Sequence, residues 1–205
     1  MTAQRRPGRV VAVLGPDGSG KSTFCDALVA GPLASHEVRR LHHRPGVFAS
    51  GTSTGIPVTE PHAGRPYPAL LSLAKLAFLF LDFRIGWWIQ IKPFVARGGW
   101  IVWERPWWDI AIDPTRYRLQ GCEGAARLLG GALPNPDLVI ILEAPVDVLL
   151  SRKREVSEAE LIRQTQELRR VVPKRVRTTL LDSQQPISVL VDQAGRDLDQ
   201  IAEQP

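Results

Sequence analysis

The sequence predicts an α/β fold in which a parallel sheet of five strands is covered by helices on both faces. Three apolar runs indicate strands that are buried on both sides: VVAVL near the N-terminus, WIVW at Trp100–Trp103 and DLVIIL at Asp137–Leu142. Such runs are typical of parallel sheets, whereas half-exposed strands alternate apolar and polar residues. Helical patterns separate the strands along the chain, as parallel crossover connections require.

The composition is that of an ordinary globular protein, with 205 residues of which 44% are apolar and 23% are charged. We expect residues 1–8 to form a flexible tail and residues 9–205 to fold as a single domain. The two cysteines, Cys25 and Cys122, match neither a disulfide framework nor a metal-binding spacing, and no N-terminal apolar segment resembles a signal peptide. These features favour a cytoplasmic protein.

The charge of the chain favours small anionic molecules over nucleic acid as partners. The net charge is +5, and 21 of the 26 basic residues are arginine, which binds phosphate oxygens in a bidentate manner. The basic residues are scattered, and the sequence contains no helix-turn-helix or zinc module, which argues against nucleic-acid binding. A homodimer is compatible with this composition.

The elements of the N-terminal part follow from apolar runs and from the glycines and prolines that end them. After a first strand at Arg9–Leu14, we expect a helix over Ser22–Ala30, stopped by the Gly31–Pro32 pair. A second strand is expected at Glu37–Leu41. Residues 44–68 are rich in Gly, Pro, Ser and Thr without periodicity, which predicts a long loop of the kind that often carries function.

The run Leu70–Ile91 is long enough to span a bilayer, but its charged residues argue against that placement. A charged residue near a bilayer centre costs about 2.5 to 3.5 kcal/mol on insertion scales, so we predict a buried core helix and no membrane contact. Its polar residues share one helical arc, which suggests that they line a cavity, a Lys75/Asp82 pair being the alternative. They are Ser72, Lys75, Asp82, Gly86 and Gln90.

The C-terminal part continues the alternation of strands and helices. The strand at Trp100–Trp103 ends in Glu104, and Ser157 with Glu160 forms the capping-box pattern of a charged amphipathic helix. The other expected elements are a helix within Leu119–Leu133, a strand at Asp137–Leu142, a helix at Val146–Arg152, the capped helix at Ser157–Val172, a fifth strand at Ile187–Val191 and a last helix from about Ala194.

The stretch GPDGSGKST contains the phosphate-loop pattern G-x-x-x-x-G-K-[ST], with a strand before it and a helix after it. In such loops backbone N–H groups and the helix N-terminus bind phosphate oxygens, the lysine adds a charge and the serine hydroxyl binds Mg²⁺. We therefore expect ATP and Mg²⁺ as cofactors. The expected nucleotide-binding residues are Gly15, Asp17, Gly18, Ser19, Gly20, Lys21, Ser22 and Thr23.

GPDGSGKST also resembles the phosphate loop of thymidylate kinases and related nucleoside monophosphate kinases. WERPWWD, from Trp103, is similar to the D-R-[YF] element of that family, with Glu104 in place of Asp, and the run Pro136–Glu155 resembles its later strand, helix and arginine-bearing lid. The likeness is greatest to divergent members that carry HHRPG, here His42–Gly46, and DPTRYR, here Asp113–Arg118. The resemblance implies a three-layer α/β/α sandwich with strand order 2-3-1-4-5 and a lid at about residues 152–158.

The resemblance also implies roles for individual residues. Asp17 would meet a sugar hydroxyl of the acceptor, Arg105 would bind the acceptor phosphate, and Glu104 would act near Mg²⁺ together with Ser22. A carboxylate at the end of an apolar strand suits water-held Mg²⁺. Glu143 is the rival strand-end carboxylate, and a structural Glu104/Arg105 ion pair is the alternative to a catalytic role.

Catalytic charge is expected from Lys21, from Arg105 and from the lid, because Gly18 stands where some family members carry a catalytic arginine. The lid carries Arg152, Lys153 and Arg154, of which the two arginines are the catalytic candidates, and a solvated helix end is the alternative. Further residues are expected to contact the acceptor, the tryptophans by stacking from a loop. They are Arg44, Trp107, Trp108, Arg116 and Arg118.

Together these features predict a P-loop kinase that transfers the γ-phosphate of ATP to a nucleoside monophosphate. One alternative is a kinase that acts on a hydroxyl of a sugar or natural product. A second alternative is a nucleotide-dependent regulatory or nucleic-acid-binding protein. The GTPase pattern N-K-x-D does not occur in the sequence.

Overall fold

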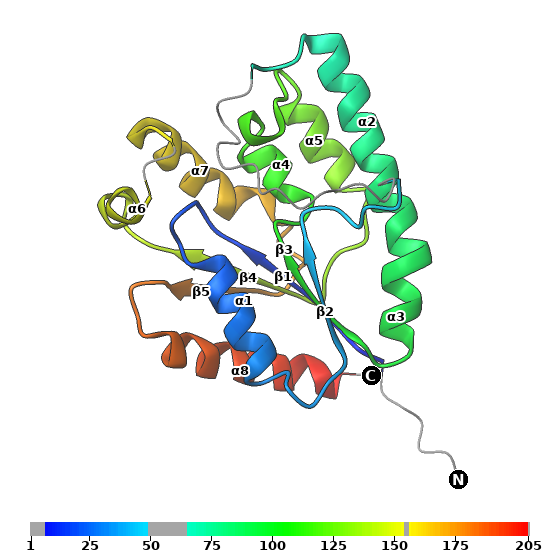
Figure 1. The fold of residues 1–205 in the computed structure, drawn as a ribbon, viewed down its shortest axis with the longest axis vertical. Coiled ribbons are helices and arrows are strands. Elements are labelled where there is room, and N and C mark those ends of the chain that lie inside the picture. Colours follow the sequence, from blue (N-terminus) through cyan, green and yellow to red (C-terminus); the bar gives the residue numbers. More distant parts are fainter. Residues whose placement is uncertain (1–6, 49–64, 154–155, 205) are drawn as a thin grey trace.

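A computed structural model describes residues 7–48, 65–153 and 156–204 and contains one five-stranded parallel sheet (Figure 1). The strand order is β2-β3-β1-β4-β5, which confirms the predicted order. The strands are β1 (Val10–Leu14), β2 (Val38–His42), β3 (Trp100–Glu104), β4 (Leu138–Glu143) and β5 (Thr178–Asp182). All four pairings are parallel, so the carboxyl ends of the strands lie at one edge of the sheet.

The central strand β1 is buried on both faces because helices cover the sheet on both sides, which confirms the predicted three layers. Val11 and Val13 pack into one apolar cluster with α1 (Lys21–Ala30) and α8 (Ile187–Glu203). Val10, Ala12 and Leu14 face the opposite cluster. That side is formed by α2 (Ala69–Gly86), a π-helical turn (Trp87–Ile91), α3 (Lys92–Ala96), α4 (Trp108–Ile112), α5 (Glu123–Gly130) and α7 (Glu158–Val171).

The prediction of a strand at Ile187–Val191 is wrong, because these residues form the first turns of α8. Ile187, Leu190, Val191 and Ala194 recur at helical spacing, and Leu190 and Ala194 are buried. The fifth strand is instead β5, which lies at an edge of the sheet and buries only Leu181. An edge strand with one solvent-exposed face lacks the continuous apolar run that is typical of the inner strands.

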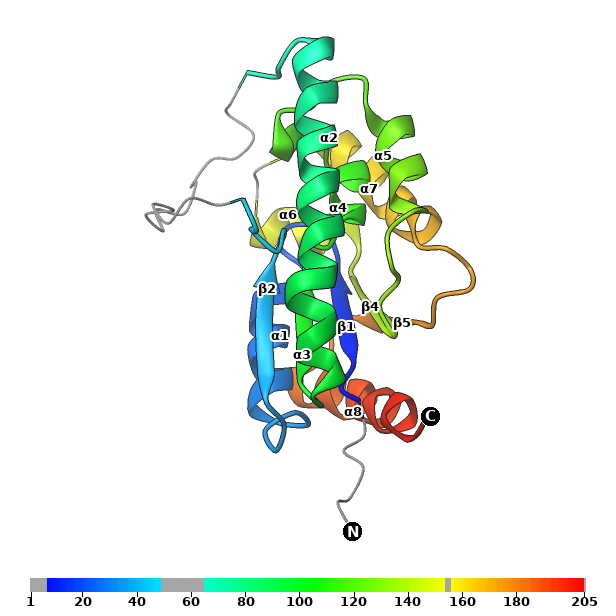
Figure 2. The same ribbon diagram turned by 90° about the vertical axis from the view of Figure 1, so that its right-hand side faces the viewer.

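The helix expected at Leu70–Ile91 is longer than predicted, because α2, the π-helical turn and α3 follow one another as a single column (Figure 2). Only one face of this column is buried, through residues such as Leu76, Leu79 and Phe83. Leu70 and Leu81 on the other face are 79% and 50% exposed, so the helix is not a fully buried core helix as expected. Among the described residues, no helix is long and apolar enough to cross a membrane.

The two helices near the expected lid are α6 (Val146–Arg152) and α7. The backbone N–H of Glu160 donates to the Ser157 hydroxyl at 3.3 Å, so the predicted N-cap of α7 forms. The lid expected at about residues 152–158 includes residues 154 and 155, which lie outside the described residues.

Candidate active site

The phosphate loop connects β1 to α1 at the carboxyl edge of the sheet. Its glycines are required by geometry: a Cβ on Gly15 would lie 2.7 Å from the Leu142 carbonyl oxygen, and Gly20 has a φ of 82°. Gly20 precedes the first residue of α1, and no side chain caps this helix. The first N–H groups of α1 are thus left for an anion, as the sequence pattern predicts.

Lys21 is buried beneath this loop, and its Nζ donates hydrogen bonds of 2.7 Å to the carbonyl oxygens of Gly15 and Pro16. Burial lowers the pKa of Lys21 to about 8, and the nearby Arg105 adds to this shift while Asp17 opposes it. A bound anion stabilises the charged form of a buried ammonium group. The lysine is therefore placed for nucleotide phosphates.

Ser22 and Glu104 meet beside the loop. The Ser22 hydroxyl donates to Glu104 Oε1 at 2.8 Å, and Arg40 lies 3.3 Å from Glu104 Oε2. Hydroxyl and carboxylate oxygens fit the ligand preference of Mg²⁺. Glu143, the rival carboxylate, instead accepts two hydrogen bonds of 2.8 Å from Arg169 on α7. Among the described residues, no group of three or more His, Cys, Asp or Glu side chains could hold a metal ion.

Asp17 and Arg105 form the centre of a buried ion-pair cluster. Arg105 follows Glu104 at the end of β3, and its backbone adopts a left-handed φ of 55°, an uncommon conformation for a residue other than glycine. Its guanidinium pairs with Asp17 through one nitrogen and with Asp109 on α4 at 3.2 Å through another. The Tyr117 hydroxyl donates to the same Asp109 carboxylate at 2.6 Å. The structure thus brings the predicted Asp17 and Arg105 together.

Arg116 extends the cluster from the other side. Its guanidinium pairs with the second carboxylate oxygen of Asp17 and, at 3.2 Å, with Asp113. Burial alone would raise the pKa of Asp17, but Arg105, Lys21 and Arg116 outweigh it and hold that pKa well below its usual range. Asp17 is therefore a carboxylate at neutral pH, and it bridges the two arginines.

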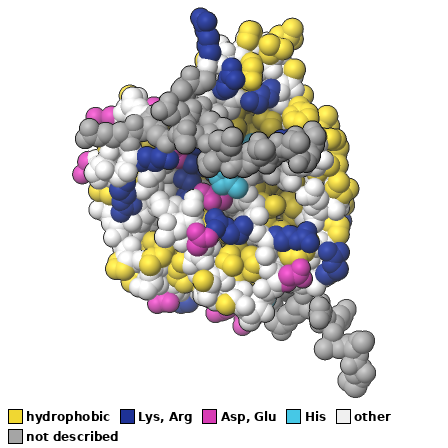
Figure 3. All heavy atoms as spheres, in the orientation of Figure 1, with side chains coloured by type: hydrophobic (Ala, Val, Ile, Leu, Met, Phe, Trp, Pro, Cys, Tyr) yellow, Lys and Arg dark blue, Asp and Glu magenta, His cyan; other side chains and the backbone are white. Residues whose placement is uncertain are grey.

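His43 lies on the wall of this cluster. Its ring stacks on Tyr117 with centroids 4.4 Å apart, and its backbone φ is 64°. Burial lowers the pKa of His43 to about 4, and within the described part of the chain its buried Nδ1 has no hydrogen-bond partner. Figure 3 shows acidic, basic and histidine side chains next to one another near the middle of the visible face.

Arg152, one of the two lid candidates, reaches the phosphate loop. It donates to the Ser183 carbonyl oxygen at 3.1 Å, to the Ser183 hydroxyl at 3.2 Å and to the Gly18 carbonyl oxygen at 3.4 Å. A cleft of about 250 Å³ opens here between the loop and the start of α8, lined also by Thr23 and Gln185. Arg154, the second candidate, lies outside the described residues.

The polar residues of α2 do not share one cavity. Asp82 accepts hydrogen bonds from the backbone N–H groups of Gly46 and Phe48, and Arg44 lies 3.7 Å from it, so Asp82 does not form the pair with Lys75 that we considered. Lys75 instead donates to the Tyr117 carbonyl oxygen at 2.8 Å, beside the ion-pair cluster.

Ser72 and Arg118 lie at the same end of the site. The Ser72 hydroxyl donates to the Tyr67 carbonyl oxygen at 3.0 Å and accepts from the Gln120 N–H at 3.1 Å. Arg118 donates to the Arg65 carbonyl oxygen at 2.8 Å and packs over the Tyr67 ring at 4.3 Å.

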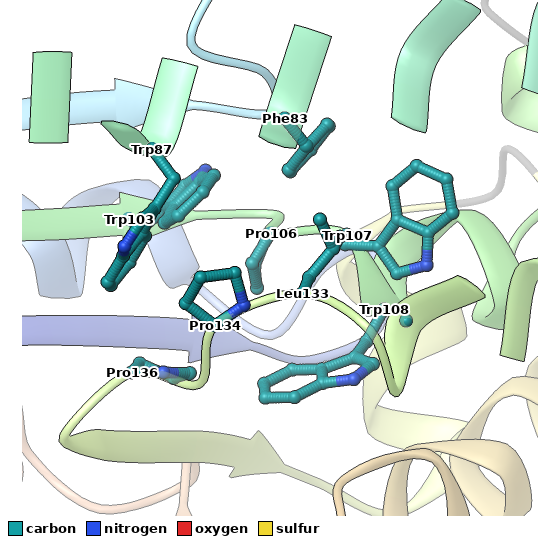
Figure 4. A pocket seen from close by; sticks show the side chains of 10 residues that line it. Phe83, Trp87, Trp103, Pro106, Trp107, Trp108, Leu133, Pro134 and Pro136 are labelled. Carbon is teal, nitrogen blue, oxygen red and sulfur yellow. The ribbon is translucent and has the colours of Figure 1, made fainter. Parts of the chain in front are cut away.

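Trp107 and Trp108 are not on an open loop as expected. Trp108 is the first residue of α4, and both side chains are buried in the apolar cluster, because their large apolar rings fill the space between α2 and α5. The Trp107 Nε1 donates to the Ala126 carbonyl oxygen at 2.7 Å. They line an apolar cleft of about 30 Å³ together with Trp87, Trp103 and prolines (Figure 4).

Sequence reasoning missed Asp109 and Tyr117 as members of the site. The signal for Asp109 was present, because an acidic residue four positions after Arg105 is the spacing of a helical ion pair. Tyr117 lies within the quoted DPTRYR segment, but nothing in the sequence shows that its hydroxyl meets Asp109. Lys75 was predicted only as part of the polar stripe.

Comparison with known proteins found no matching family model and no match among the curated proteins. Among solved structures, the fold is similar to that of thymidylate kinase from Candida albicans, with a TM-score of 0.68 and 18% sequence identity. The similarity covers 96% of this chain and 94% of that chain. At this identity the likeness establishes the fold alone, so the chain has a thymidylate kinase-like α/β fold.

Proposed function

We propose that the protein is a P-loop phosphotransferase that uses MgATP to phosphorylate a small acceptor. The observation that supports this proposal most strongly is the arrangement around the phosphate loop: Lys21 lies beneath it, the Ser22/Glu104 pair lies on one side, and the Asp17/Arg105 pair lies beside them. Phosphoryl transfer depends on positioning and charge neutralisation more than on covalent chemistry, and these groups suit both tasks.

On the donor side, the loop amides and Lys21 would bind the phosphates of ATP, and the cleft beside Arg152, Ser183 and Gln185 would take its base. Ser22 and Glu104 would hold Mg²⁺, which when bound neutralises charge on the phosphates. Arg152 would add charge from the lid, as we propose for Arg154 also.

On the acceptor side, the resemblance indicates a nucleoside monophosphate whose phosphate binds Arg105, with Arg116 beside it. A specific observation favours the second candidate, phosphorylation of a hydroxyl: Arg105 is already paired with Asp17 and Asp109, and Arg116 with Asp17 and Asp113. Both candidates place the acceptor next to Asp17, between the phosphate loop and the segment that carries Arg116.

A homodimer also belongs to this proposal. The outer face of α2 exposes apolar side chains, among them Leu70, Leu73 and Leu81, and exposed apolar patches of this kind mark interaction surfaces. Sedimentation of the wild type and of Leu73→Glu tests this: a dimer for the first and a monomer for the second is the expected result, and a monomeric wild type would contradict it.

The test of the phosphotransferase is ADP formation from MgATP with a panel of nucleoside monophosphates, nucleosides, sugar phosphates and sugar acids. Lys21→Ala should abolish ADP formation, and Lys174→Ala, a matched change at an exposed lysine, should leave it unchanged. ATP binding without turnover of any acceptor would favour the regulatory alternative, and normal turnover by Lys21→Ala would refute the donor site.

A further inference from the structure

We propose that the acceptor presents an uncharged hydroxyl to Asp17 and carries its negative charge at its other end, where Lys75 and Arg118 bind it. The inference rests on the proposed phosphotransferase and assigns the acceptor class: a small hydroxyl compound with a phosphate or carboxylate group, such as a phosphorylated or oxidised sugar. Two independent features of the site support it, one at each end.

At the inner end, the two arginines beside Asp17 are already paired with carboxylates. Arg105 pairs with Asp17 and Asp109, and Arg116 pairs with Asp17 and Asp113. These side chains are largely buried. A phosphate dianion at Arg105 would have to displace a buried carboxylate and leave it beside like charges, which is costly where water is excluded.

The hydrogen bonds around Arg105 strengthen this argument. Asp109 is held by the Tyr117 hydroxyl as well as by Arg105, and Arg105 together with that hydrogen bond lowers the pKa of Asp109 against the effect of burial. Asp109 therefore remains a carboxylate and remains on Arg105. An uncharged hydroxyl needs no such displacement, because a carboxylate has about four lone-pair sites and Asp17 uses two of them for Arg105 and Arg116.

At the outer end, by contrast, two cations form no ion pair with a carboxylate of the described residues. Lys75 and Arg118 are half-buried, and both lie over the Tyr67 ring, with cation-to-centroid distances of 5.0 and 4.3 Å. Within residues 7–48, 65–153 and 156–204, no carboxylate forms an ion pair with either of them. Burial and the neighbouring Arg118 and Arg44 lower the pKa of Lys75. Two neighbouring, partly desolvated cations, whose contacts among the described residues are an aromatic ring and carbonyl oxygens, can stabilise a bound anion.

One short segment joins the two ends. Arg116 pairs with Asp17, the Tyr117 hydroxyl reaches Asp109 while its carbonyl oxygen accepts from Lys75, and Arg118 follows directly. The proposed acceptor would lie along this segment, with Asp17 at one end and the two outer cations at the other. The distribution of charge thus orients the acceptor, with its neutral end toward the phosphate loop.

The reaction is a simple ester formation. The acceptor hydroxyl oxygen bonds to the γ-phosphorus of ATP while the bond from that phosphorus to the bridging oxygen breaks, and the bond electrons leave with ADP. The hydroxyl proton is released to solvent. Asp17 accepts the hydrogen bond of the hydroxyl and aims its oxygen at the phosphorus, which is a positioning role consistent with its lowered pKa.

A binding experiment tests the outer site. The protein is first saturated with Mg²⁺ and a non-hydrolysable ATP analogue, which fills the phosphate loop, and inorganic phosphate is then titrated by calorimetry. Lys75→Gln and Arg118→Gln should each weaken phosphate binding at least about tenfold, since each removes a charge-assisted contact. Arg127→Gln, at an arginine on α5 paired with Glu167, should not change it. Unchanged binding in both site variants, or no phosphate binding by the wild type, would overturn the proposal.

The product tests the inner site. With the acceptor panel, ³¹P NMR should show a new phosphate ester on a carbon-bound hydroxyl, formed from acceptors that carry a phosphate or carboxylate group, and Lys75→Gln should raise the KM for that acceptor more than it lowers kcat. Conversion of nucleoside monophosphates to diphosphates, seen as a new phosphoanhydride signal, would overturn this inference and leave the phosphotransferase standing. Failure of the ATP analogue to bind would instead refute the phosphotransferase.

Discussion

The Ser22 hydroxyl donates a 2.8 Å hydrogen bond to Glu104 Oε1, and this bond joins the first turn of α1 to the carboxyl end of β3. The two residues are 82 positions apart, and they meet because β1 and β3 are parallel neighbours with Val13 opposite Glu104. The pair places a hydroxyl oxygen and a carboxylate beside the phosphate loop. It also distinguishes Glu104 from Glu143, whose carboxylate is turned toward α7.

From this relationship we expect Glu104→Gln to lower kcat about 10²-fold or more, because it removes the charge that would hold Mg²⁺ near the transferred phosphate. Glu143→Gln is the matched control and should change kcat little, since Glu143 pairs with an exposed arginine. Steady-state kinetics over a range of Mg²⁺ concentrations provides the measurement. An equal loss in the two variants would show that the metal assignment is wrong.

Asp109→Asn should destabilise the protein by about 3 to 5 kcal/mol, because it breaks a buried pair and leaves Arg105 with one carboxylate fewer. Asp192→Asn, the same change at an exposed position of α8, should alter the free energy of unfolding by less than about 0.5 kcal/mol. Urea unfolding at pH 7 compares the two. Equal stability of both variants would mean that the pair contributes nothing.

His43 should make the stability of the wild type depend on pH. Its pKa is lowered to about 4 in the folded state, so between about pH 6.5 and pH 4 the unfolded chain binds the additional proton. Stability conferred by the neutral ring is therefore present above pH 6.5 and is lost as the pH falls toward 4, by up to about 3 kcal/mol.

The variant His43→Asn tests this, because asparagine tolerates the left-handed backbone at this position and does not titrate. Its free energy of unfolding should fall less than that of the wild type between pH 7 and pH 4.5. His36→Asn, at an exposed histidine, should retain the pH dependence of the wild type. Parallel curves for the wild type and His43→Asn would contradict the assignment.

Gly15→Ala should abolish ATP binding and destabilise the fold, because the added Cβ would lie 2.6 Å from the Ser19 hydroxyl and 2.7 Å from the Leu142 carbonyl oxygen. Gly124→Ala on α5 is the control: no atom lies within 4 Å of its added Cβ, and alanine favours the helix. We expect that control to be more stable than the wild type by about 0.5 to 1 kcal/mol in thermal or urea unfolding, with unchanged nucleotide affinity. A Gly15→Ala variant that still binds ATP would exclude the loop as described.

Local signals in the sequence predicted a parallel sheet covered on both faces and a phosphate loop after its first strand, whereas the strand order was implied by the resemblance to thymidylate kinases. Buried parallel strands are continuous apolar runs, and the loop between β1 and α1 needs glycine at fixed positions. The sequence could not predict β5 at Thr178–Asp182. An edge strand with one solvent-exposed face has no continuous apolar run, and Ile187–Val191 is the more apolar segment.

Only the tertiary structure decided which side chains meet. Trp107 and Trp108 lie next to Arg105 in the sequence, yet α4 turns them into the core, whereas Tyr117 and Lys75 come from other elements and join the site. The sequence does not show whether Arg105 faces solvent or two carboxylates. Its pairing with Asp17, 88 positions away, depends on long-range packing. The physical reason is that residue types and spacing encode local conformation, while the charge balance of a buried site is the sum of contacts that only the folded chain brings together.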